Sequence, residues 1–346
     1  MKLCPDCECW IIQNQCACVR VKGAKMKEYK YDLFKDGLTK TAILTFMECK
    51  RLFYFRFIRG WSPTEESDSL IFGVLFHQCA EFWYKNKDSK DNIVLEHVAD
   101  AILENYEGEN DAETWGLARR QQWEIIKAKL TVVFPAYVHW YAKEDATFVW
   151  REIETVFQTP IRVKAHGKEY EVIITGKMDR VFNRTKRNGV LDIKTKGFIN
   201  LGGITNTLLY DFQMNLYAWA ANKLYGAKYD HIIYDIVHNP SLRLSQKETV
   251  DAYCERIKKD IGKNPADYFI RVEQKMQAAH LAKFEPVLKK TVAEIVEFYL
   301  DGKNSEDFFT PSCLGPYGQC ELLEICYRGD AAKLKKREFV HPELHE

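Results

Sequence analysis

Two aspartates and a lysine stand close together in a segment whose pattern predicts a β-hairpin. Asp179 follows an apolar run, and Asp192 and Lys194 lie in the next apolar run, after a polar, turn-rich stretch. Side chains alternate between the two faces of a strand, so Asp192 and Lys194 point the same way. If the turn centres near Thr185–Lys186, antiparallel pairing sets Asp179 opposite Asp192. The segment therefore predicts two carboxylates and an ammonium group on one patch of a sheet.

Such a patch suits metal-assisted chemistry on a phosphate. Neighbouring carboxylates repel each other unless a cation neutralises them, and oxygen ligands suit Mg²⁺ or Mn²⁺. An ion held in this way contacts a phosphate oxygen and lowers the pKa of a bound water. Lys194 would orient the attacking water or offset developing negative charge. The alternative is a surface hairpin with ordinary charged residues, because D-x-K triplets are common.

A helix is expected directly after the hairpin, over residues 208–224. It carries Gln213 and Tyr217, which are separated by one helical turn and so project from one face. Its ends are marked by residues that commonly cap helices, namely Asn206 or Thr207 at the start and Gly226 at the end.

Two further polar residues precede the hairpin. Residues 70–86 predict an amphipathic helix that carries Gly73 and, four positions later, His77. A lone histidine on such a helix is usually a packed or surface residue, and the alternative is a neutral imidazole ligand to a metal. Glu154 lies in a region of strand periodicity, as does Glu152, which would share its face.

In this order, the motifs resemble the PD-(D/E)XK nuclease superfamily, and more narrowly the branch with the nuclease domain of RecB, AddB and the CRISPR-adaptation nucleases. The resemblance implies an α/β fold with a central mixed sheet flanked by helices. It also implies metal-dependent hydrolysis of DNA phosphodiester bonds, most readily as an exonuclease, with Mg²⁺ or Mn²⁺ as cofactor. The implied catalytic residues are Asp179, Asp192, Lys194, Glu154, Gln213 and Tyr217, and the implied metal ligands are His77, Asp179, Asp192 and the backbone carbonyl of Ile193.

Composition limits the class of protein. The chain has 346 residues, of which 46% are hydrophobic and 13% aromatic, as in a globular protein. Its formal net charge is only +1, so any DNA-binding surface must be a local basic patch. The apolar runs are short, so no transmembrane helix and no membrane partner are expected. The N-terminus lacks the apolar core of a signal peptide, which favours the cytoplasm, or the host cytoplasm if a phage encodes the chain.

The remaining elements are expected around the motifs. The glycine-rich residues 196–203 predict a flexible loop. Strands are expected over 147–182 and 229–240, and helices over 91–107, 112–142, 245–262 and 280–301.

Eleven cysteines are many for a reducing compartment, where clustered cysteines bind metals more often than they form disulfides. Residues 1–22 carry a dense group, and four thiolates would hold Zn²⁺ tetrahedrally in a zinc-ribbon-like segment. The alternative is a disordered cysteine-rich tail. The expected zinc ligands are Cys4, Cys7, Cys16 and Cys18, with Cys9 as a surplus ligand.

A second group of cysteines lies near the C-terminus. Cys313, Cys320 and Cys326 leave one position of a four-ligand centre open. Cys49, just before a basic and aromatic run, resembles the distant fourth ligand in iron–sulfur members of the same branch. The resemblance implies a [4Fe–4S] cluster on these four residues. Zinc is the chemical alternative, because the sequence does not distinguish the two.

The expected organisation is a zinc segment over 1–22, a basic linker over 23–37 and one nuclease domain over 38–346. DNA, as single strands or duplex ends, is the expected partner, with a helicase, recombinase or integrase as a further one. The implied context is recombination, repair or phage replication. Two alternatives stay open: a CRISPR-adaptation nuclease that trims DNA ends, and a non-catalytic DNA-binding scaffold with the same fold.

Overall fold

The computed structural model describes residues 29–89, 93–185, 187–226, 228–302, 313–315 and 318–344. These residues form two compact units. We call residues 66–156 and 177–282 the sheet unit, and residues 29–65, 157–176 and 283–344 the cysteine unit.

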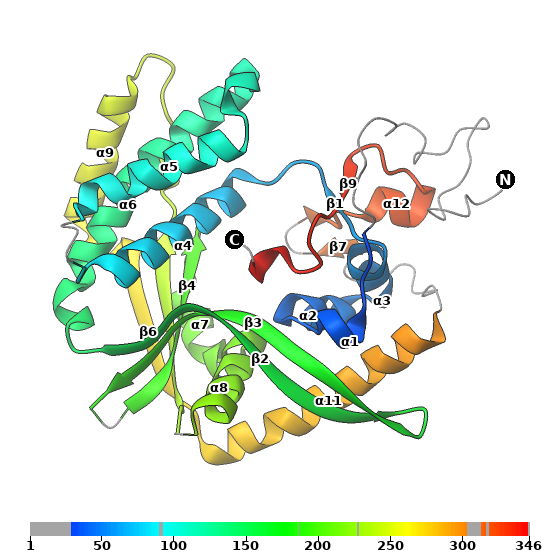
Figure 1. The fold of residues 1–346 in the computed structure, drawn as a ribbon. Helices are drawn as coiled ribbons and strands as arrows, with labels where there is room; N and C mark the ends of the chain where they lie inside the picture. Colours follow the sequence, from blue (N-terminus) through cyan, green and yellow to red (C-terminus); the bar gives the residue numbers. More distant parts are fainter. Residues whose placement is uncertain are drawn as a thin grey trace, which may run out of the picture. The chain divides into compact units, whose positions relative to one another are not determined.

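The sheet unit is built on a mixed sheet (Figure 1). Among the described residues, the strand order is β2-β3-β4-β5-β6, and β2 and β3 run on from the sheet unit into the cysteine unit. The β3–β4 and β5–β6 pairs are antiparallel, whereas β4 and β5 are parallel. The strands are β2 (Val149–Ala165), β3 (Lys168–Arg184), β4 (Arg187–Lys196), β5 (His231–His238) and β6 (Phe269–Lys275).

Helices cover both faces of strand β4. Leu191 and Ile193 pack into the apolar core that α4, α5, α6 and α9 share. Asp192, between them, faces the other way and contacts Gln213 on α8. The alternation along one strand thus separates an apolar face from the face that carries the polar motif. The helices of this unit are α4 (Asp68–Asn86), α5 (Val98–Glu109), α6 (Leu117–Asp145), α7 (Leu201–Thr207), α8 (Phe212–Tyr225), α9 (Val250–Lys263) and α10 (Pro265–Tyr268), and α11 (Ala278–Asp301) continues into the cysteine unit.

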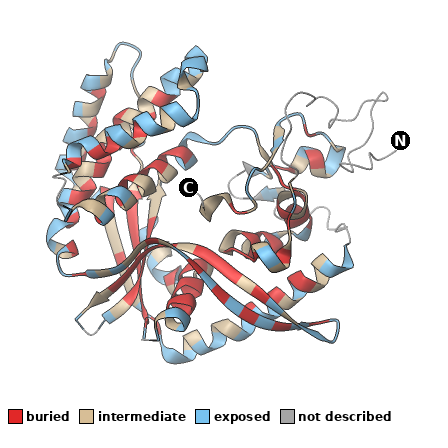
Figure 2. Ribbon diagram, in the orientation of Figure 1, coloured by how far each residue is buried: buried red, intermediate tan, exposed pale blue. Residues whose placement is uncertain are grey.

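Helix α8 is buried along nearly its whole length, unlike the more exposed α5 and α6 (Figure 2). Small residues such as Ala218 and Ala221 alternate with large ones such as Trp219, so most of its surface is apolar. A helix that is apolar on most sides belongs in an interior. Its polar residues Gln213 and Tyr217 are therefore buried as well, and they need partners there.

The cysteine unit contains the outer parts of β2 and β3 and most of α11, together with several short helices and strands. Its apolar cluster contains Leu52, Phe55, Trp61 and Leu322, and Cys49 packs against this cluster. Its elements are α1 (Leu33–Asp36), α2 (Lys40–Glu48), α3 (Lys50–Phe53), a π-helical turn (Tyr54–Ile58), β1 (Trp61–Pro63), β7 (Leu314–Gly315), β8 (Gly318–Gln319), α12 (Leu323–Arg328) and β9 (Leu334–Lys336).

The main elements agree with the sequence, including the hairpin, the histidine-bearing helix and the mixed sheet flanked by helices. Three details differ from the expectation. The helix after the hairpin begins at Phe212, because Asp211 caps it by accepting a hydrogen bond from Met214. Residues 197–200 of the expected loop form neither helix nor strand, but its last three residues begin helix α7, where Asn200 accepts a hydrogen bond from the backbone N–H of Gly203. Strand β6 was not expected at all.

None of the helices in the described ranges combines the length and the apolar composition that crossing a bilayer requires.

Candidate metal centre

Asp179 lies where the pairing of the hairpin strands stops. The backbone register of β3 with β4 runs from Arg184–Arg187 to Arg180–Leu191, and one further step sets Asp179 opposite Asp192. At that point the carboxylate of Asp179 accepts the backbone N–H of Ile193 at 2.6 Å, in place of a carbonyl. The carboxylate is therefore fixed by a backbone donor at the end of the hairpin ladder.

His77 and Glu154 join Asp179 from two other elements. His77 Nδ1 on α4 lies 3.3 Å from Glu154 Oε1 on β2 and 3.5 Å from Asp179 Oδ2. One potential ligand atom from each of the three residues lies within 4.8 Å of the other two. Glu154 and Asp179 are buried, and His77 is half-buried. We call these three residues the acidic triad.

Glu154 reaches the triad through an unusual backbone conformation. Its φ is +48°, in the left-handed region that costs an ordinary residue about 1–2 kcal/mol. Glu152 instead accepts a hydrogen bond from Thr155, so the two glutamates do not act as equivalent members of one strand face. Strained backbone concentrates at functional sites, which supports a functional role for Glu154.

The second polar set joins the hairpin to α8. Lys194 Nζ lies 2.7 Å from Asp192 Oδ2 and donates to Gln213 Oε1 at 2.8 Å. Gln213 Nε2 in turn donates to Asp192 Oδ1 at 2.8 Å and to the Tyr217 hydroxyl at 3.0 Å. Gln213 thus fixes both the carboxylate and the ammonium group of the D-x-K motif. Asp192 is not part of the acidic triad.

The electrostatics of the acidic triad favour an added positive charge. Burial lowers the pKa of His77, but Asp179, Glu154 and Asp192 outweigh it and raise that pKa to about 9. Burial raises the pKa of Asp179 above its usual value, and the positive charge of His77 opposes this only in part. Burial likewise opposes the charge of Lys194, yet Asp192 and Asp179 raise its pKa. The carboxylates around His77 thus favour positive charge at this point.

The donor set fits a hard divalent cation. Two carboxylates and one imidazole can coordinate Mg²⁺ or Mn²⁺, with water or a phosphate oxygen in the remaining positions. Within the described part of the chain, Asp179 forms an ion pair with His77. A metal ion bound by these two residues would therefore displace the proton of His77.

The chain matches the PD-(D/E)XK nuclease superfamily over residues 38–327. This chain belongs to that superfamily. Membership implies a metal-dependent nuclease, and the acidic triad is a possible metal site for such an enzyme.

Other comparisons add little to the superfamily assignment. A solved structure titled "Crystal structure of SSO0001" is 15% identical, and the similarity covers 72% of this chain and 98% of that chain with a TM-score of 0.26. A similarity at this TM-score is too slight to support an argument. No curated protein matches the chain.

Two residues beside the acidic triad, Lys177 and Glu81, belong to none of the motifs found in the sequence. Lys177 Nζ lies 3.1 Å from Glu81 Oε2 and 3.2 Å from Glu154 Oε2. Glu81 is one helical turn beyond His77, and Lys177 is two residues before Asp179. Only these spacings point to Glu81 and Lys177 in the sequence, because their contacts join segments that are far apart in the chain.

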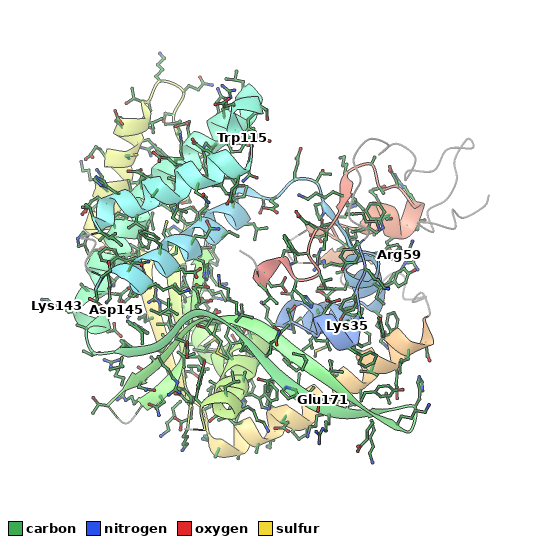
Figure 3. All side chains as sticks on the ribbon, in the orientation of Figure 1. Lys35, Arg59, Trp115, Lys143, Asp145 and Glu171 are labelled. Atoms are coloured by element: carbon green, nitrogen blue, oxygen red, sulfur yellow. The ribbon has the colours of Figure 1, made fainter. Side chains whose placement is uncertain are left out.

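A second buried cluster, which we call the balanced network, lies elsewhere in the sheet unit. Arg271 bridges Asp145 and Asp235, with nitrogen–oxygen distances of 2.6 and 2.8 Å. Tyr137 donates to Asp235 at 2.6 Å and accepts from the buried Arg180 at 3.3 Å. Asp145 is labelled at the C-terminal end of α6 in Figure 3. Two arginines and two aspartates form the buried part of this cluster, and the more exposed Glu144 lies 3.7 Å from Arg271.

The C-terminal cysteines and Cys49 belong to the cysteine unit. Cys49, Cys320 and Cys326 pack in one cluster, and the Cys313 carbonyl accepts the N–H of Cys320 at 3.0 Å. All four are free thiols. Burial raises the pKa of Cys326, while the nearby Arg51 lowers it and the thiols of Cys49 and Cys313 raise it further. The expected zinc ligands Cys4, Cys7, Cys16 and Cys18 lie outside the described residues.

Proposed function

We propose that this chain is a Mg²⁺- or Mn²⁺-dependent deoxyribonuclease that digests DNA from its ends. The observation that carries the proposal is the convergence of His77, Glu154 and Asp179 beside a lysine that is fixed by Asp192 and Gln213. In the balanced network the aspartates pair with an arginine, whereas in the acidic triad one potential ligand atom from each of three residues converges on one point.

Each residue has a distinct part in this proposal. His77, Glu154 and Asp179 would hold the ion, together with Asp192 and the Ile193 carbonyl. A bound Mg²⁺ or Mn²⁺ supplies Lewis acidity and lowers the pKa of a coordinated water. Lys194, whose raised pKa keeps it charged, orients the attacking water and offsets negative charge on the phosphate.

Gln213 and Tyr217 support assignment to the RecB and AddB branch. In that branch a Q-x-x-x-Y helix follows the hairpin, and here Gln213 contacts Asp192, Lys194 and Tyr217. Gln213 would hold the catalytic pair in one geometry, and Tyr217 would position the scissile strand. An exonuclease of this branch acts in DNA recombination, repair or phage replication, in the cytoplasm, beside a helicase, recombinase or integrase.

We further propose that Cys49, Cys313, Cys320 and Cys326 hold a [4Fe–4S] cluster. Cys49, Cys320 and Cys326 pack against one apolar cluster of the cysteine unit, and the Cys313 carbonyl accepts the N–H of Cys320 at 3.0 Å, so all four residues belong to one unit. Arg51, which is 9% exposed, donates to Cys326 Sγ at 3.0 Å, as expected beside a thiolate.

The cluster is tested by metal analysis of protein that is purified without oxygen. Wild type should be brown and contain iron and acid-labile sulfide in near-equal amounts. Cys49→Ser should lose both and become less soluble, because the centre joins distant parts of the chain. Cys254→Ser, which changes a half-buried cysteine of the sheet unit, should keep them. Colourless protein with zinc and no iron would defeat the cluster.

The N-terminal zinc segment stays a separate proposal. Deleting residues 1–22 should remove one Zn²⁺ and leave cleavage of short DNA intact. Loss of the C-terminal metal centre in the same deletion would contradict two independent modules.

The nuclease proposal is tested with DNA labelled at either end, as single strands and as duplexes, with Mg²⁺, Mn²⁺ or EDTA. We expect mononucleotides or short products from linear DNA, no cutting of closed circles, and no reaction in EDTA. Asp192→Ala and Lys194→Ala should abolish cleavage in folded protein. Nicking of closed circles would replace the exonuclease assignment with an endonuclease one. DNA binding without any cleavage would favour the non-catalytic scaffold.

A further inference from the structure

Lys177 contacts the carboxylate oxygen of Glu154 that does not face His77. Glu154 Oε1 faces His77 at 3.3 Å, while its other oxygen, Oε2, lies 3.2 Å from the Lys177 ammonium group. Lys177 also lies 3.1 Å from Glu81 Oε2. One carboxylate therefore joins the proposed metal position to a lysine that a second carboxylate also holds.

The lysine is well placed and charged. Its side chain is 16% exposed. A lysine side chain is ordinarily charged at neutral pH, so Lys177 places a positive charge between the carboxylates of Glu81 and Glu154.

In two-metal phosphodiesterases, the ions lie about 3.5–4 Å apart, close enough for one carboxylate to bridge them. Here the bridging carboxylate would be Glu154, and the second ion would also need Glu81. The ammonium group of Lys177 occupies the position between those two carboxylates. We propose that Lys177 takes the place of a second metal ion and limits this site to one divalent cation. The inference rests on the proposed metal site at His77, Glu154 and Asp179.

Lys194 does not duplicate this role. It pairs with Asp192 and Gln213, whereas Lys177 pairs with Glu81 and Glu154. The two lysines thus serve separate carboxylates. A purely structural Lys177, which only ties α4 to β2 and β3, would affect stability but not the number of bound ions.

The number of bound ions separates these roles. Mn²⁺ is titrated calorimetrically into the full chain without DNA, and the heat of Asp179→Asn is subtracted as background. Wild type should bind one ion at the site, and Lys177→Met should bind two. The pair of ions should show spin coupling in the electron paramagnetic resonance spectrum, since they lie about 3.5–4 Å apart. Adding Glu81→Gln to Lys177→Met should return the number to one.

Two controls match this change. Lys177→Arg keeps the positive charge and should bind one ion. Lys85→Met removes a different ammonium group that lies 2.6 Å from the other oxygen of Glu81, on the exposed side of α4, and it should also bind one. If Lys177→Met does not fold, Lys177→Gln provides the neutral variant.

Three results would overturn the inference. Two ions in wild type would show that Lys177 does not exclude the second. One ion in folded Lys177→Met or Lys177→Gln would leave Lys177 a structural ion pair while the proposed function stands. No ion in wild type would remove the metal site itself, and with it the proposed function.

Discussion

The acidic triad and the balanced network are both buried charged clusters of the sheet unit, yet they differ in charge balance. In the balanced network, Arg271 lies between two aspartates, and Arg180 completes an equal number of positive and negative charges. In the triad, two carboxylates face one histidine, whose pKa rises to about 9. In the network the aspartates pair with an arginine, whereas in the triad two carboxylates and an imidazole converge on one point, as ligands of a cation do.

The pKa values of the acids and bases make the same distinction. In the balanced network, aspartate and tyrosine neighbours raise the pKa of Arg180 and Arg271 even though burial opposes their charge. In the triad, burial raises the pKa of Asp179, so its charged form is disfavoured there. The network thus favours the charged form of its arginines, whereas burial in the triad disfavours the charged form of Asp179.

The largest expected effect is on catalysis beside the triad. Lys194→Met should lower the rate of DNA cleavage by about 10³–10⁴-fold, or about 4–5 kcal/mol in transition-state free energy. Mn²⁺ affinity should stay within a few-fold, because Lys194 is not a proposed ligand. Single-turnover kinetics and calorimetry measure the two quantities. A rate near that of wild type would remove Lys194 from the reaction.

In the balanced network, the main effect should be on stability instead. Asp235→Asn should lower the free energy of unfolding by about 3 kcal/mol, because the charge of the buried Arg271 then loses a partner. Urea denaturation measures this change. Mn²⁺ affinity of the folded fraction should not change. A variant that kept its stability but lost the metal would reverse the roles of the two clusters.

Gln213→Ala should have an intermediate effect at the site. Gln213 fixes Asp192 and Lys194 without being a proposed ligand, and removal of such a supporting residue typically costs about 10–100-fold. The cleavage rate should fall by this factor. Tyr217→Phe, which removes only the hydroxyl that accepts from Gln213, should cost less. Equal and complete loss in both variants would indicate a folding defect, which circular dichroism would detect.

The smallest effect is expected on the stability of the triad without metal. Asp179→Asn removes a carboxylate whose ionised form the folded protein disfavours at neutral pH, because its pKa is raised. The variant also loses the pairing of Asp179 with His77, which opposes this gain, so in EDTA the free energy of unfolding should stay within about 1 kcal/mol of wild type. A loss as large as that expected for Asp235→Asn would mean that the triad is structural.

Local patterns in the sequence predicted the hairpin and its partner helix well. The register of Asp179 with Asp192 follows from the turn position, and the spacing of Gln213 and Tyr217 follows from helix geometry. Both depend on residues that are close in the chain. These patterns could not separate Glu154 from Glu152, because a regular strand would place both on one face and the left-handed φ of Glu154 breaks that rule.

Contacts between distant segments were beyond reach of the sequence. Lys177 meets Glu81 across 96 positions, and no spacing rule connects a helix to a strand at that separation. Helix α7 was missed because its two glycines favour a loop, whereas the cap at Asn200 stabilises the first turn. The charge partners that distinguish the two buried clusters come from distant segments, so they are known only from the folded structure.

Calorimetric titration of Mn²⁺ into wild type and Asp179→Asn, with DNA cleavage measured on the same preparations, tests the central claim most directly. Asparagine keeps the size of the side chain and an oxygen that can accept the N–H of Ile193, so the fold should persist. The account predicts that wild type binds Mn²⁺ and cleaves DNA, and that folded Asp179→Asn loses both. Unchanged Mn²⁺ affinity together with unchanged cleavage in Asp179→Asn would contradict it.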